Sequence, residues 1–539
     1  MAGGRVLGLK SKQEPFKRKL SLIDVTFIGL GAMIGSSWMF APQTAVQLAG
    51  PAALLSWVIA AIALGMLALV YAELGGALPS AGGFIRYPNY SHGDLVGFII
   101  SCMSFITYSV SASLEVVAIR TYLSAWWPSL GSHNPTVLGW LIQLFLLITF
   151  FLINYWSVNV FGKINSVVTI IKFAVPVLTI IVLLNYFTPS NFYVDGFLTN
   201  GFGGVESAIA TAGIAYAFIG FQQTINFSAE AKNPGRTIPI ATMLSIGLAG
   251  LLYFLLQFAY IGAIPGHLLE NGWAGLSLGS PFADLTALLG LMWLMNLLMA
   301  DAILSPGGAA NVGFGATARI IYAWAKNKTF FKIFTNVDEK TGVPRVALWF
   351  TFILAVFWTL PFPSWEALVS VAASSAIMAF ITGPISAAAF RITAPDLHRP
   401  FKLKGFAVIA PIAFIISSFI IYWSGWKTIS WLFAFELFLF VAYIVVWKGK
   451  RKSQTILRKQ MKTASWLVFY NVSMFILSWL GTFGGNGWIL APWDQIFVAL
   501  LSVVTYYWGA KSAMPNPVFD TDHVHIVDKS DLSVSNRTT

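Results

Sequence analysis

The chain of 539 residues is 57% hydrophobic and 15% aromatic, only 10% of its residues are charged, and its mean hydropathy is +0.74. This composition excludes a soluble globular protein and indicates a polytopic membrane protein. The net charge of +12 fits the basic inner loops of membrane proteins and calls for no nucleic-acid partner. The single cysteine, Cys102, excludes a disulfide framework and a cysteine-based metal site.

Apolar windows of about 20 residues, enough to cross about 30 Å of hydrocarbon as a helix, recur along the chain. They predict an all-α protein with fourteen membrane spans between two polar tails, residues 1–20 and 512–539. The spans are expected at 22–45, 52–78, 96–126, 137–155, 164–186, 206–228, 238–263, 286–322, 345–361, 367–390, 407–424, 429–447, 464–483 and 488–510.

The basic residues give this count an independent test, because Lys and Arg concentrate on the cytoplasmic side of membrane proteins. If the N-terminus is inside, the inner loops and tails hold all 33 Lys and Arg residues except Lys427, Arg120 and Lys172. If the spans are counted differently, the basic residues no longer gather on one side of the membrane. The sequence therefore predicts a multi-pass protein of the cell membrane with both termini in the cytoplasm.

The first span contains FIGLGAMIGSSWMF, residues 27–40, in which glycines and serines interrupt an apolar run. These residues are poor helix formers. Gly31 and Gly35 form a GxxxG pair, for which close helix packing is one interpretation. A second interruption lies in the sixth span, in IAYAFIGFQQTINFSAE, where polar side chains follow Gly220. Two interrupted spans favour locally unwound helices over packing alone.

The two interruptions lie at the start of two successive blocks of five spans, residues 21–186 and 187–391, with the remaining spans in 392–511. Because five is odd, the second block enters the membrane from the opposite side. This pattern predicts an inverted-repeat transporter with its site near the bilayer midplane. An unwound helix offers free N–H groups to a carboxylate and free carbonyls to an ammonium, which together suit an amino acid.

The ionisable side chains expected inside the spans include Glu73, Glu115, Lys172, Asp301 and Glu436. Lys172 lies about 13 Å into the fifth span at 1.5 Å per residue. It either pairs with a buried partner for structure alone or, once desolvated, releases and regains a proton during transport. Asp301 and Glu115 are possible partners for a cation, a proton or the substrate, and a purely structural role for them is equally open.

Four segments resemble motifs of the amino acid/polyamine/organocation (APC) superfamily of permeases. They are GLGAMIGSSWMF (29–40), PSAGGFIRYPNYSHG (79–93), AFIGFQQTINFSAEAKNPGRTIP (217–239) and TARIIYAWAKN (317–327). The resemblance covers roughly the first 400 residues. It implies a leucine-transporter-type fold of five plus five helices in inverted repeat, with about four additional C-terminal helices.

The resemblance also implies which residues bind the substrate. The amides around Gly35, Ser36 and Ser37 would hold its carboxylate, the carbonyls of Met33, Tyr216, Ala217 and Phe218 its amine, and Tyr216 would stand at an aromatic gate. Gln222 replaces a glutamate that is usual in the family and cannot release a proton. Proton coupling is therefore assigned to Lys172, which matches a fifth-helix lysine of proton-coupled members.

The function expected from these features is secondary active, proton-coupled amino acid symport by alternating access, with substrate at the unwound middles of helices 1 and 6. The small number of deep carboxylates favours an acidic or small neutral substrate. An amino acid/amine antiporter and a non-transporting amino acid sensor are the alternatives. The chain offers no cluster of catalytic spacing, so no enzyme activity, cofactor or metal is expected. The expected partners are the amino acid, protons and the lipid bilayer, and oligomeric state is left open.

Overall fold

The computed structural model describes residues 18–80, 82–131, 134–156, 158–338, 340–360, 364–449, 454–517 and 519. In these ranges the regular elements are helices, and the one extended pairing is an isolated bridge between Leu20 and Ala231. The all-α class is thus confirmed. Most of the two predicted tails lies outside the described residues.

The α-helices follow one another closely along the chain. In order they are α1 (Leu22–Met33), α2 (Ser37–Ala49), α3 (Ala53–Ala77), α4 (Gly83–His92), α5 (Asp94–Leu123), α6 (Val137–Trp156), α7 (Val158–Leu183), α8 (Gly201–Thr211), α9 (Ile214–Ala217), α10 (Gln222–Asn226), α11 (Pro234–Ala263), α12 (Pro281–Leu288), α13 (Met292–Lys326), α14 (Arg345–Trp358), α15 (Trp365–Phe380), α16 (Thr382–Thr393), α17 (Phe406–Trp423), α18 (Trp426–Gly449), α19 (Gln454–Leu480) and α20 (Trp493–Lys511).

Every predicted span overlaps at least one of these helices. Among the described residues, 9 helices are long and apolar enough to cross a membrane, or up to 10 if the bent pair Gly201–Thr211 and Ile214–Asn226 is one span. The helices α1 and α14 are apolar but shorter. The structure thus supports a multi-pass membrane protein, while the count of fourteen stays a prediction.

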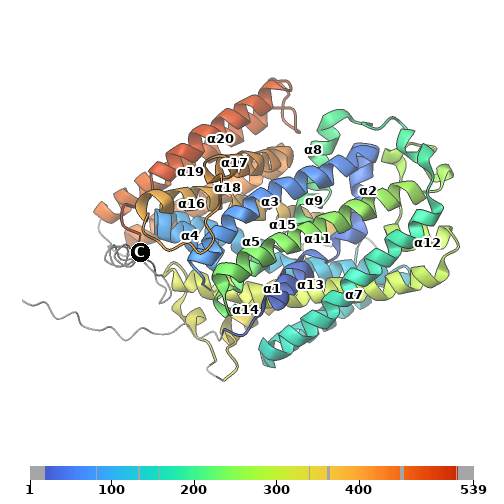
Figure 1. Cartoon of the computed structure of the whole chain (residues 1–539), viewed down its shortest axis with the longest axis horizontal. Coiled ribbons are helices and arrows are strands. Elements are labelled where there is room, and N and C mark those ends of the chain that lie inside the picture. The colour runs from blue at the N-terminus through green and yellow to red at the C-terminus, as the bar shows by residue number, and fades with distance from the viewer. Residues whose placement is uncertain are drawn as a thin grey trace, which may run out of the picture.

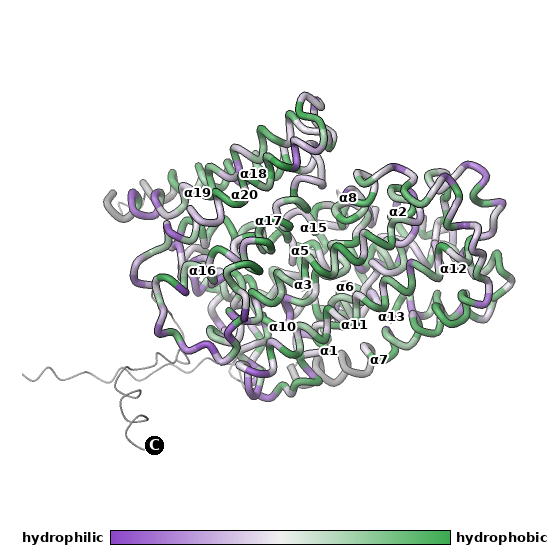
Figure 2. Tube along the Cα trace, turned by 45° about the horizontal axis from the view of Figure 1, so that its top comes forward, coloured by the Kyte–Doolittle hydropathy of each residue, from purple (hydrophilic) through white to green (hydrophobic). Residues whose placement is uncertain are grey.

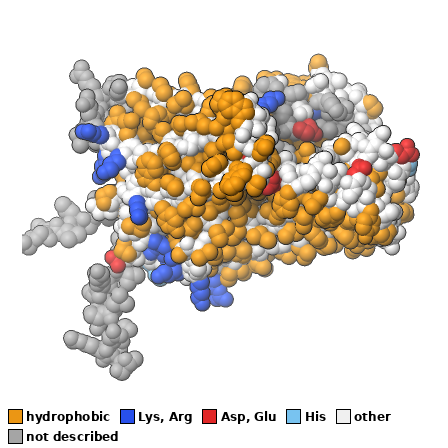
Figure 3. All heavy atoms as spheres, turned by 90° about the horizontal axis from the view of Figure 1, so that it is seen from above, with side chains coloured by type: hydrophobic (Ala, Val, Ile, Leu, Met, Phe, Trp, Pro, Cys, Tyr) orange, Lys and Arg blue, Asp and Glu red, His pale blue; other side chains and the backbone are white. Residues whose placement is uncertain are grey.

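The helices run roughly alongside one another in an elongated bundle (Figure 1). Helix α3 packs on α11, and α5 packs on both α13 and α15. Hydrophobic residues dominate the helical stretches, and hydrophilic residues gather in the connections (Figure 2). The flank shown in Figure 3 is covered by hydrophobic side chains, and Lys and Arg gather toward one end. This is the surface expected of a protein surrounded by lipid.

Both predicted helix interruptions are confirmed. The first leaves a gap between Met33, the end of α1, and Ser37, the start of α2. The second leaves a turn between α9 and α10. A further break before α9 was not predicted: Gly213 has φ +85°, a left-handed conformation that favours glycine, and the chain bends there by 43°.

Candidate functional site

The two helix breaks lie directly against each other. A Cβ atom added to Gly220 would lie 2.6 Å from the backbone nitrogen of Met33 and 2.9 Å from the carbonyl carbon of Ala32. Only a residue without a side chain allows this approach. On the other side of the first break, a Cβ atom on Gly35 would lie 2.5 Å from Oε1 of Glu115. The glycines identified in the sequence therefore permit close contacts as well as unwinding.

Helix α5 brings Glu115 to the first break. The backbone N–H of Ser36 donates to Oε2 of Glu115 at 2.9 Å, and the indole Nε1 of Trp365 donates to the Ser36 hydroxyl at 2.7 Å. All three residues are buried. An amide predicted to hold the substrate carboxylate thus holds a carboxylate of the protein itself. The geometry shows that this amide can bind an anion, and its role toward substrate stays a prediction.

Protein donors occupy the carbonyls that were predicted to hold the substrate amine. The hydroxyl of Tyr253 donates to the Met33 carbonyl at 2.7 Å and to that of Ala217 at 3.4 Å. The carbonyl of Tyr216 accepts from the Ile219 amide at 2.8 Å, and that of Phe218 accepts from the Gly220 amide at 2.8 Å. The Met33 carbonyl also accepts from the Gly35 amide at 2.9 Å, and that of Phe218 also accepts from the Phe221 amide at 3.4 Å. Because a carbonyl has two lone pairs, these two are fully engaged, whereas the Ala217 carbonyl has room for a further donor.

Lys172 of α7 and Asp301 of α13 complete a group of buried charges around α1. The Lys172 ammonium is fully buried and donates to the carbonyl of Gly31. Asp301 accepts from the Ser305 hydroxyl at 2.8 Å through Oδ2, while its Oδ1 has no hydrogen-bond partner among the described residues. Lys172 interacts electrostatically with both Glu115 and Asp301. Three helices far apart in sequence thus bring Glu115 to the first break, Lys172 to the α1 carbonyl of Gly31, and Asp301 within electrostatic reach of Lys172.

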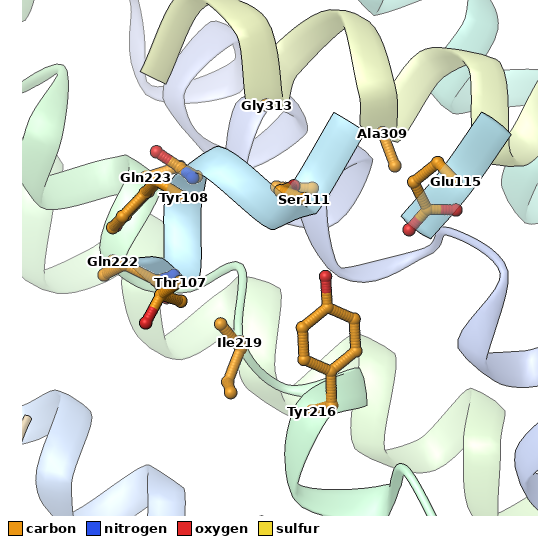
Figure 4. Close-up of a pocket in the computed structure, with 11 residues that line it drawn as sticks. Thr107, Tyr108, Ser111, Glu115, Tyr216, Ile219, Gln222, Gln223, Ala309 and Gly313 are labelled. Carbon is orange, nitrogen blue, oxygen red and sulfur yellow. The ribbon is translucent and has the colours of Figure 1, made fainter. Parts of the chain in front are cut away.

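A small cavity of about 20 Å³ lies between the two breaks, α5 and α13. Its lining residues are Ala32, Thr107, Tyr108, Ser111, Glu115, Tyr216, Ile219, Gln222, Gln223, Ala309 and Gly313. The hydroxyl of Tyr216 points into the space between Ser111 and Glu115 (Figure 4). A cavity of this size holds about one water molecule, so its lining must rearrange before an amino acid fits.

The structure separates the predicted residues into two groups. Glu115, Tyr216 and Gln222 line the cavity. The predicted residues outside its lining are Met33, Gly35, Ser36, Ser37, Ala217, Phe218, Lys172 and Asp301. Ser37 is the buried first residue of α2.

Sequence reasoning missed Thr107, Tyr108, Ser111, Gln223 and Tyr253. A signal for two of them was available, since Thr107, Ser111 and Glu115 follow one another at intervals of four and therefore share one helix face. In the described part of the chain, no group of three His, Cys, Asp or Glu residues could hold a metal ion.

Broken helices that meet at buried charges are typical of membrane transporters. Comparison with known proteins identifies the class of transporter. The chain belongs to the amino acid permease family of the APC superfamily: the family model described as "Amino acid permease" matches residues 20–430. This confirms the resemblance found in the motifs. The family and its matched relatives are transporters, in accordance with the expectation of no enzyme activity.

Three relatives from Bacillus subtilis (strain 168) cover most of the chain. It is 45% identical to an aspartate-proton symporter over 518 residues, which cover 95% of this chain and 100% of the relative. It is 39% identical to the glutamate/serine transporter AimA over 508 residues, 92% of this chain and 94% of the relative. It is 27% identical to the branched-chain amino acid permease BcaP over 462 residues, 83% and 96% of the two chains.

Proposed function

We propose that the protein is a proton-coupled symporter of an acidic amino acid, with aspartate as the first substrate to test. The observation that carries the proposal is the hydrogen bond from the Ser36 amide to Glu115 beside the Lys172 ammonium. It puts an anion-binding amide and two groups able to exchange a proton at one helix break. The relatives named as an aspartate-proton symporter and a glutamate/serine transporter support the substrate class.

In the proposed binding step, the substrate carboxylate replaces Glu115 at the Ser36 amide, with the backbone of Gly35 and Ser37 beside it. The substrate ammonium is held by the carbonyls of the two breaks, and Tyr216 covers it. The small volume of the cavity means that α1 and α9 separate to admit substrate and close around it. This closure is the alternating-access step of the proposal.

The proton in this proposal keeps the site from gathering too much negative charge. Glu115 and Asp301 as carboxylates and Lys172 as an ammonium sum to one negative charge, and an acidic amino acid adds another. Uncompensated charge is expensive in a buried site. Transfer of a proton from Lys172 to Glu115 frees the Ser36 amide, and the transported proton then restores the ammonium. Lys172 is therefore the proposed coupling residue, with Glu115 and Asp301 as its partners.

The cavity lining supports an acidic rather than a cationic substrate. Ser111 and Gln222 offer a hydroxyl and an amide donor, and Glu115 is the one charged side chain among the described lining residues. A substrate with a cationic side chain would need a second carboxylate in the lining, because Glu115 is already engaged with the Ser36 amide. The side-chain carboxylate of an acidic substrate needs only hydrogen-bond donors, which the lining supplies.

Transport into proteoliposomes tests this function. Aspartate should accumulate in empty vesicles when a pH gradient, and not a sodium gradient, is applied. Uptake that requires an amino acid or amine inside the vesicle would show obligate exchange instead. Thermal stabilisation by aspartate without any uptake would show a sensor. Either result would overturn the proposal.

The proposed architecture has inverted repeats over residues 21–186 and 187–391, additional helices over 392–511, and both termini in the cytoplasm. The contact between one break from each repeat supports it. A membrane-impermeant maleimide tests the orientation in a Cys102→Ala background. Lys427→Cys should react in intact cells, whereas Lys340→Cys should react only after permeabilisation; the reverse pattern would invert the topology.

A further inference from the structure

A second and much larger recess lies at the start of α11, apart from the cavity between the breaks. It is a groove with a volume of about 670 Å³, formed by the first turns of α11, by Leu69 of α3 and by the loop at Pro400 and Phe401. None of its described lining residues lines the smaller cavity. The groove is therefore a candidate site separate from the cavity between the breaks.

The groove is preformed because its loop wall is fixed to the bundle. Arg391 and the amide of Leu403 both donate to Oε2 of Glu73, at 2.6 and 2.7 Å. The guanidinium of Arg399 donates to the Phe390 and Leu397 carbonyls at 2.9 Å each. These bonds hold the chain on both sides of Pro400.

The loop also touches the start of α11 very closely. A Cβ atom on Gly235 would lie 2.5 Å from Cβ of Pro400. Because a larger residue at 235 would push the loop away, the glycine allows the wall to close against the helix. The shape of the groove is thus set by tight packing and does not depend on an occupant.

One cation marks the polar end of the groove. Arg236 lines it and is exposed, and no ion pair to its guanidinium is found in the part of the chain that the structure describes. No described lining residue is a carboxylate. Two further exposed cations, Lys232 and Lys402, are close in sequence to the lining residues Asn233 and Phe401. The polar end of the groove is therefore complementary to an anion.

From Arg236 an apolar stripe continues along the same face of α11. Its exposed members are Ile240, Leu244, Leu248 and Leu251, at intervals of three or four residues. From Arg236 to Leu251 the stripe is about 22 Å long at 1.5 Å per residue. That length exceeds the roughly 15 Å that one leaflet contributes to the hydrocarbon core. An acyl chain can therefore lie along the stripe while its headgroup stays at Arg236.

We propose that this groove binds an anionic phospholipid of the surrounding bilayer, with the headgroup phosphate on Arg236 and an acyl chain along Ile240 and Leu244. A lipid fits both parts of the surface, since it joins an anion to a long apolar chain. The groove also lies close in sequence to the second break, because α11 begins shortly after that break. The segment before α11 is tied to the start of α1: the Lys19 amide donates to the Glu230 carbonyl at 2.9 Å, and the Lys232 amide to the Leu20 carbonyl at 3.0 Å.

Native mass spectrometry of the full-length protein tests the site. The protein is delipidated and exposed to equal amounts of palmitoyl-oleoyl phosphatidylglycerol and the phosphatidylcholine with the same chains. We expect phosphatidylglycerol to be retained about fivefold over phosphatidylcholine, the factor that one basic side chain near a membrane surface provides. Arg236→Gln should abolish this preference and Arg236→Lys should keep it. Lys328→Gln, which removes an exposed cation outside the groove, should keep it too.

A second pair of variants tests the apolar part. Met243→Trp fills the groove while leaving Arg236 in place, so it should reduce retention of the anionic lipid severalfold. Ile353→Trp, on an exposed face of α14, should leave retention unchanged.

Equal retention of the two lipids by the unaltered protein, or an unchanged preference in Arg236→Gln, would overturn the proposal. Disulfide-linked dimers formed by Met243→Cys in a Cys102→Ala background would overturn it as well, because the groove would then face a second copy of the chain.

Discussion

Replacing Gly220 by alanine tests whether contact between the two helix breaks holds the site together. The added Cβ would lie 2.6 Å from the Met33 backbone nitrogen, so the segments must separate by about 0.8 Å to reach the ordinary contact distance of 3.4 Å. A backbone nitrogen cannot rotate away as a flexible side chain can. Overpacking of this kind typically costs about 1–3 kcal/mol.

That cost falls on the closed arrangement of the site, because the contact is lost when the breaks separate. A ligand that needs the closed arrangement should therefore bind about 5–150-fold more weakly, the range that corresponds to 1–3 kcal/mol. The assay is equilibrium binding of labelled aspartate to the purified variant. Its elution as a single species in gel filtration checks the fold.

Gly247→Ala is the matched control for Gly220→Ala. A Cβ atom on Gly247 meets no heavy atom within 4 Å, and the residue lies inside α11. Alanine in a helix interior is expected to add roughly 0.5–1 kcal/mol of stability, and aspartate affinity should not change. If Gly220→Ala binds aspartate within twofold of the unaltered protein, contact between the breaks does not control the site.

Four further substitutions, at three positions, address the buried charges. Lys172→Ala should remove uptake driven by a pH gradient while leaving some aspartate binding, and unchanged pH-driven uptake would contradict its coupling role. Glu115→Gln imitates the protonated acid, so its affinity for aspartate should be the same at pH 6 as at pH 8. If the variant keeps the pH difference of the unaltered protein, Glu115 and substrate do not compete for the Ser36 amide. Glu436 and Asn471 form a hydrogen bond, and each has one buried oxygen without a hydrogen-bond partner among the described residues. A protonated Glu436 would have a hydroxyl to donate to the Asn471 oxygen. Glu436→Gln should therefore keep the melting temperature, whereas Glu436→Leu should cost about 1–3 kcal/mol; equal losses would refute a protonated Glu436.

The sequence revealed those parts of the site that depend on local chemistry. Gly35, Gly220 and their neighbours interrupt apolar runs, and low helix propensity is a property of the residues themselves. Lys172 stood out because a charge is rare in an apolar segment. Both kinds of signal can be read without knowing which helices are neighbours.

The rest of the site depends on contacts between distant segments. Glu115 is 79 residues from Ser36, and Tyr253 is 220 residues from Met33. Helix packing decides such contacts, and one sequence does not specify it. The interval of four between Thr107, Ser111 and Glu115 indicates a polar helix face, but it does not show that the face meets the break in α1.

The contact between Glu115 and Ser36 also bears on why proton and substrate would move together. If the Ser36 amide serves the substrate carboxylate, Glu115 and substrate cannot use it at the same time, because a single N–H donates fully to one acceptor. Ionised Glu115 then excludes substrate, and a proton on Glu115 weakens its hold, since charge-assisted hydrogen bonds are roughly twice as strong as neutral ones. Lys172 lies within electrostatic reach of Glu115, so the state of either group alters the other. Coupling would thus need no long-range signal, because the proton and the substrate act on the same backbone amide.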